Sequence, residues 1–160
     1  MSTSQNQSPD QDTPQRPIRI GWREYLSLPE WGIERIKAKM DTGARTSAIH
    51  VHEIQELDDG RLRFEVVIKE RPKRKSVWIE AEPLRVTKVK PSSGVRQHRF
   101  VVQALMRLGS VERTIELSLV SRKGMLCRML VGRKALEGDF VIDPSSKYII
   151  NKQHHQPPQT

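Results

Sequence analysis

The residues best suited to chemistry in this chain are Asp41, Thr42 and Gly43, the only Asp-Thr-Gly triplet in the sequence. A tight turn of these residues would present the Asp carboxylate at a cleft, with the Thr hydroxyl buried beneath it and Gly admitting backbone N–H groups. Two such carboxylates can share one proton and activate a water, because like charges that close cannot both ionise. The alternative is an ordinary turn without chemistry.

A second segment, Met129 to Leu136, combines apolar residues with Gly132 and Arg133. The run from Gly132 to Glu137 predicts a short helix that Gly138 ends. In aspartic peptidases, an apolar-apolar-Gly segment packs behind the turn that carries the catalytic Asp. Leu130-Val131-Gly132 has this composition.

Together these motifs resemble the retropepsins, the single-lobe aspartic proteases of retroviruses. The chain is more closely similar to the bacterial retropepsin-like family once labelled ATP-dependent zinc proteases. The resemblance covers most of the chain and is carried by Ile20–Glu24, Leu28–Glu30, Ile36–Ala48, Ser92–Gly94, Met129–Arg133 and Asp143–Pro144.

This resemblance implies an all-β fold: a closed six-stranded acid-protease barrel of one lobe, with its active site completed between two subunits. Asp41 is then the catalytic aspartate, and Thr42 and Gly43 hold its turn. Because each chain carries one such Asp, catalysis requires a homodimer, at least a transient one. The implied activity is that of an aspartic endopeptidase.

Five positions are candidates for substrate binding. Ala44 would line the pocket, and because it cannot donate a hydrogen bond to the ionised carboxylate, we expect activity nearer neutral pH. Arg45 lies where retropepsins use an acidic residue, which suggests an acidic substrate. Lys90, Arg96 and Arg133 could also pair with substrate carboxylates. For Arg133 the alternative is a structural tie within the barrel or the dimer interface.

The formal net charge of +9 lies within the central part of the chain, because the polar ends carry nearly balanced charges. We predict a disordered N-terminal tail over residues 1–17, a domain over 18–151 and a disordered C-terminal tail over 152–160. A basic domain attracts polyanions, either nucleic acid or an acidic peptide. The few aromatic residues disfavour nucleic acid.

The resembled family is associated with ATP-grasp ligases that add glutamate tails to proteins. An acidic, Glu-rich or poly-glutamate-tailed substrate and a glutamate ligase partner are therefore implied. The rival hypothesis is a non-catalytic basic β-barrel module that binds ribosomal RNA or a glutamate ligase, with Asp41 kept as a structural turn.

Alternation of apolar and polar residues predicts strands, and no internal repeat suggests a second lobe. Leu84 to Arg99 is basic, breaks at Pro91–Gly94 and is a candidate flap, with a solvated hairpin as the alternative. A turn is expected at Asp143–Pro144. The predicted strands are Arg61–Ile68, Ser76–Glu80, Phe100–Leu105, Arg113–Val120 and Phe140–Ile142.

No cofactor or metal is expected. His50 and His52 are predicted to share one face of a strand, with Glu53 or His98 as a third ligand, but a zinc helix, paired cysteines and a phosphate-binding Gly-rich loop are all missing from the sequence. The single Cys127 favours a reducing compartment. With no apolar N-terminal segment, a cytoplasmic location without membrane attachment is expected.

Overall fold

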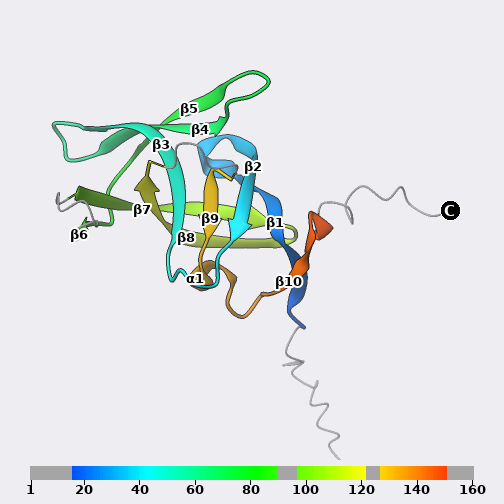
Figure 1. Cartoon of the computed structure of the whole chain (residues 1–160). Helices are drawn as coiled ribbons and strands as arrows, with labels where there is room; N and C mark the ends of the chain where they lie inside the picture. The colour runs from blue at the N-terminus through cyan, green and yellow to red at the C-terminus, as the bar shows by residue number, and fades with distance from the viewer. Residues whose placement is uncertain (1–15, 90–96, 122–126, 151–160) are drawn as a thin grey trace, which may run out of the picture.

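The computed structural model describes residues 16–89, 97–121 and 127–150, and Figure 1 shows their arrangement. The described elements are almost all strands. In chain order they are β1 (Ile18–Leu28), the 3-10 turn η1 (Pro29–Trp31), β2 (Ile33–Met40), β3 (Ser47–Glu56), β4 (Leu62–Lys69), β5 (Lys75–Ala81), β6 (Arg85–Val89), β7 (Gln97–Leu108), β8 (Val111–Val120), β9 (Met129–Val131), α1 (Arg133–Leu136) and β10 (Phe140–Lys147).

Six of these strands close into a ring in the order β1-β2-β9-β3-β8-β7, and a pairing of Ser27 with Arg107 returns the ring to β1. β10 and β6 extend the sheet beyond β1 and β7, while β4 and β5 form a hairpin beside β3 (Figure 1). The predicted all-β fold, with six strands closed on themselves and one short helix near the C-terminus, is confirmed.

One cluster of buried apolar side chains fills the fold. On β4, Leu62, Phe64 and Val66 are buried at alternate positions, as a half-buried strand requires. The strand prediction was therefore correct here, within one residue at each end. No helix in the described part of the chain is long and apolar enough to cross a membrane.

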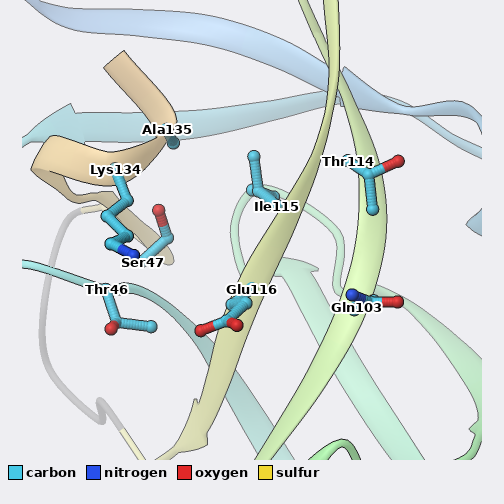
Figure 2. A pocket seen from close by; sticks show the side chains of 8 residues that line it. All are labelled: Thr46, Ser47, Gln103, Thr114, Ile115, Glu116, Lys134 and Ala135. Atoms are coloured by element: carbon cyan, nitrogen blue, oxygen red, sulfur yellow. The ribbon is translucent and has the colours of Figure 1, made fainter. Parts of the chain in front are cut away.

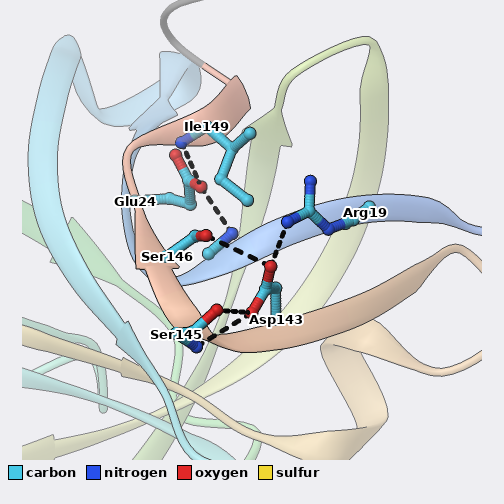
Figure 3. Close-up of polar contacts among 7 residues, drawn as sticks. Arg19, Glu24, Asp143, Ser145, Ser146 and Ile149 are labelled. Carbon is cyan, nitrogen blue, oxygen red and sulfur yellow. Dashed lines mark hydrogen bonds and ion pairs between the residues drawn. The ribbon is translucent and has the colours of Figure 1, made fainter.

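The parallel pairing of β1 with β10 joins the two ends of the described domain (Figure 3). Gly21 permits it, since a Cβ there would lie 2.5 Å from the backbone oxygen of Ser146. Glu24 is fully buried, and its Oε2 accepts hydrogen bonds from the backbone N–H groups of Gly21 at 2.7 Å and Ile149 at 2.9 Å. These contacts fasten the C-terminal strand to β1.

Asp143 makes a second set of polar contacts where β1 and β10 meet (Figure 3). Its carboxylate accepts hydrogen bonds from the hydroxyl and N–H of Ser145 and pairs with Arg19, which together hold its pKa well below the ordinary value. The turn predicted at Asp143–Pro144 appears only as an irregularity within β10, which continues to Lys147 but loses its register with β1 between Asp143 and Lys147. Pro144 is tolerated because β10 lies at the sheet's edge, where a missing N–H breaks no essential pairing.

The predicted basic hairpin is present in part. β6 and β7 pair antiparallel, from Arg85 opposite Val101 to Val89 opposite Gln97. The tip, including Lys90 and Arg96, lies outside the described residues, as do most of the predicted tails.

Candidate active site

The Asp-Thr-Gly triplet occupies the loop between β2, which ends at Met40, and β3, which begins at Ser47. Asp41 is half-buried, and its Oδ1 accepts a hydrogen bond from the N–H of Gly43 at 3.0 Å. The N–H of Ala44 donates to the Asp41 carbonyl at 3.2 Å and closes the turn. The carboxylate is therefore oriented by its own turn.

Strand β9 lies between β2 and β3 and supports this turn from behind. Val131 is in register with Met40 of β2, and Leu130 is in register with Ala48 of β3. Directly beyond β2, the N–H of Asp41 donates to the Val131 carbonyl at 2.9 Å. The apolar segment far along the sequence thus packs behind the Asp turn.

Position 132 requires glycine, because the backbone directly after β9 lies very close to the backbone directly before β3. A Cβ at this position would lie 2.8 Å from the Thr46 carbonyl carbon and 2.9 Å from the Arg45 oxygen, both backbone atoms. Its N–H donates to the buried Ser47 Oγ at 3.0 Å. Sequence reasoning assigned Ser47 no role, although it stands within the matched Ile36–Ala48 segment.

The structure corrects one expectation about Thr42. Its side chain is exposed in the single chain, because the turn projects at the end of the strand ring, near α1 (Figure 1). The turn is held instead by Arg133, whose Nη1 donates to the Thr42 carbonyl at 2.9 Å and whose N–H donates to the Ala44 carbonyl at 2.8 Å. These bonds favour the structural alternative for Arg133, and its binding of substrate stays a prediction.

A polar pocket of about 220 Å³ lies beside the turn. Arg85 donates a hydrogen bond to Glu116 at 2.7 Å and lowers the pKa of that carboxyl, with smaller effects from Lys134 and Arg45. Arg45, four positions after Asp41 in the same loop, is therefore one of the cations that lower the pKa of this pocket carboxyl. The pocket, seen in Figure 2, is lined by Thr46, Ser47, Gln103, Thr114, Ile115, Glu116, Lys134 and Ala135.

The two histidines that were considered as metal ligands differ in their solvent exposure. His50 is 1% exposed, whereas His52 lies at the surface. The pairing of β3 with β4 is irregular between Val51 and Ile54, just beyond His50. Within the described residues, no three His, Cys, Asp or Glu side chains gather as a metal site.

A ring of six strands, with an Asp-Thr-Gly loop held against an apolar-Gly strand, defines the class of retropepsin-like proteins. The family model for the retropepsin-like aspartic endopeptidase RimB matches residues 19–153. The chain belongs to this RimB-like family.

Curated relatives carry a different name. A "Probable alpha-L-glutamate ligase" from Parasynechococcus marenigrum is 35% identical over 136 residues, which cover 83% of this chain and 29% of the relative. One from Desulfotalea psychrophila is 39% identical over 129 residues, covering 79% and 28% respectively. The chain thus spans less than a third of the length of these relatives.

A solved structure has a similar fold. The protein Lpg0085 from Legionella pneumophila, described as of unknown function, matches with a TM-score of 0.67 and 29% identity. The match covers 84% of this chain and 99% of the Legionella chain.

Proposed function

We propose that this protein is an aspartic endopeptidase that acts as a homodimer and cleaves acidic, Glu-rich peptide segments, including glutamate tails. The observation that carries the proposal is the Asp41 turn, in which Gly43 orients the carboxylate and the carbonyl of Val131 fixes the backbone. Family membership supports the same class of chemistry.

The mechanism follows from the pairing of two identical carboxylates. Asp41 of one subunit would accept a proton from the lytic water, while the protonated Asp41 of the partner subunit polarises the scissile carbonyl. The water oxygen then bonds to the carbonyl carbon, and the amine leaves after taking up a proton. The exposed side chain of Thr42 and the half-buried Asp41 leave the turn accessible to a second copy.

The acidic substrate is inferred from charge. The chain carries a formal net charge of +9, and the loop that carries Asp41 also carries Arg45, whose carbonyl accepts a 3.2 Å hydrogen bond from the N–H of Lys134. Cations at this position would favour carboxylate side chains of a bound peptide. Lys90, Arg96 and Arg133 remain candidates for the same role.

The names of the relatives support a link to glutamate ligation. Each matched segment is a small part of a longer protein named as a probable glutamate ligase. We propose that this chain acts on the glutamate-bearing product of such a ligase and contacts the ligase as a partner. No cofactor is needed for this reaction.

The substitution Asp41→Asn tests the proposal with a Glu-rich peptide and mass-spectrometric detection of products. We expect cleavage to be lost while the thermal melting profile is retained, because Asn keeps the size of the side chain and cannot accept the proton. Chelation with EDTA should leave the wild-type rate unchanged. Turnover that survives Asp41→Asn would assign cleavage to another active site, and a wild-type protein that does not cleave the peptide would favour the non-catalytic binding module.

A further inference from the structure

Strands β1, β2 and β10 carry a group of cations that we call the cationic face. Along β2, Arg35, Lys37 and Lys39 stand at alternate positions. Across the sheet, Arg23 of β1 is in register with Lys39 of β2 on one side and with Lys147 of β10 on the other. Like charges directly opposite one another destabilise a sheet, so this arrangement works against stability.

The five cations of this face form no ion pair within the described residues. Elsewhere, ion pairs neutralise Arg19, Arg61, Arg74, Arg85, Arg107, Arg113 and Arg128. The nearest acid on β1, Glu24, is fully buried and accepts backbone N–H groups instead. The cationic face therefore retains its charge for an external partner.

Aromatic rings contact four of these five cations. The guanidinium of Arg35 lies 3.7 Å from the ring centroid of Tyr25, and the ring of Tyr148 stacks on Tyr25 with centroids 4.9 Å apart. The guanidinium of Arg23 lies 4.6 Å from the Trp22 ring. Cation–π contacts order long side chains in advance, which lowers the entropy lost on binding.

The same contacts decide which polyanion fits. Single-stranded nucleic acid binds by stacking its bases on open aromatic faces. Tyr25 is occupied by Arg35 and by the ring of Tyr148, and Trp22 is contacted by Arg23 and by Lys147 at 5.5 Å. Because its rings are already covered, the cationic face favours a ligand that binds through carboxylates and does not need to stack bases on aromatic rings.

The spacing of the cations matches an extended acidic peptide. Alternate residues of a strand lie about 6.8 Å apart, which is also the distance between same-side carboxylates of an extended poly-glutamate segment. β2 runs directly into Asp41, so Arg35 lies six positions, or about 20 Å, along the strand from the Asp turn.

We propose that the cationic face binds the part of an acidic substrate that extends beyond the cleaved bond. This inference rests on the proposed function. It adds a docking surface outside the active-site turn and predicts a preference for long acidic segments.

Binding without turnover tests this docking surface. In the Asp41→Asn background, fluorescence anisotropy would measure the Kd for a labelled peptide of about twelve glutamates. Lys37→Glu with Lys147→Glu should weaken binding about ten-fold, because each exposed ion pair contributes roughly two-fold or more and the reversed charges repel the peptide. The milder pair Lys37→Gln with Lys147→Gln should weaken it less, in the same direction.

The matched control is Lys69→Glu with Lys75→Glu, which makes the same charge change on the β4–β5 hairpin, where the two exposed lysines pair in register. We expect the control to change Kd by less than about two-fold. Equal losses in the test and control variants would reduce the effect to overall charge and overturn the proposal. Unchanged binding in both test pairs would also overturn it.

Two further measurements separate this proposal from its alternatives. In protein that keeps Asp41, the Lys37→Glu and Lys147→Glu variant should raise KM for the long peptide and leave kcat unchanged. If the proposed peptidase function is wrong, the wild-type protein itself will not cleave the peptide. An oligouridylate of about twelve nucleotides should bind more weakly than the glutamate peptide. Tighter binding of the oligouridylate, lost in the test variant, would assign the face to nucleic acid and overturn the peptide proposal.

Discussion

The hydrogen bond between Ser47 and Gly132 gives a sharp test of how the Asp41 turn is held. Ser47 is 2% exposed, and its Oγ accepts the N–H of buried Gly132 at 3.0 Å. Ser47→Ala removes the acceptor and changes little else in volume. The Gly132 N–H is then left buried without a partner.

The expected cost is set by that unsatisfied donor. Leaving a buried polar group without its hydrogen bond costs about 1–3 kcal/mol, so we expect a loss of about 2 kcal/mol in the free energy of unfolding. For a domain of this size the melting temperature should fall by about 8 °C. The proposed peptidase activity should fall as well, since Gly132 directly follows the strand that supports Asp41.

Urea unfolding followed by circular dichroism measures this loss. Ser121→Ala is the matched control, because Ser121 is exposed and the same substitution there should change stability by less than about 0.5 kcal/mol. If Ser47→Ala were also within about 0.5 kcal/mol of wild type, the reasoning about the buried hydrogen bond would be refuted.

Three more predictions follow from the contacts of the fold and the turn. Gly21→Ala should cost about 2–3 kcal/mol in urea unfolding, because its Cβ would collide with the backbone oxygen of Ser146; an unchanged midpoint would contradict this. Arg133→Leu should lower kcat on a Glu-rich peptide about ten-fold by releasing the Thr42 carbonyl, and an unchanged kcat would remove Arg133 from the support of the turn. Asp143→Asn should destabilise the protein at neutral pH. Because the folded pKa of Asp143 is lowered from its ordinary 3.8, the advantage of wild type is complete above that value and disappears as pH falls through the lowered pKa. Thermal unfolding of wild type and variant at a series of pH values measures this difference in stability. A difference that does not depend on pH would contradict the lowered pKa of Asp143.

Much of the fold could be predicted because alternation is a local property. The strand around Phe64 and the short helix after Gly132 followed from the sequence within one or two residues. The strand β1 escaped individual prediction because Gly21 and Glu24 are buried where a simple alternating strand has polar residues outside. Both serve the junction with β10, which no local pattern reveals.

The site was predictable to a similar degree. The resemblance paired the Asp41 turn with Gly132, and the structure joins them through β9. The exposure of Thr42 was not foreseen, since burial depends on what covers the turn in three dimensions. The cationic face was missed because Arg23 and Lys147 are distant in the sequence and meet only through strand register.

The central claim is that each chain supplies half of a catalytic pair, and a mixing experiment tests it most directly. Wild-type protein would be exchanged with an equal amount of the Asp41→Asn variant, and cleavage of a Glu-rich peptide measured per wild-type chain. Random pairing leaves about half of the wild-type chains in mixed dimers with one functional Asp, so the rate per wild-type chain should fall to about half. An unchanged rate per wild-type chain would contradict the paired-aspartate account.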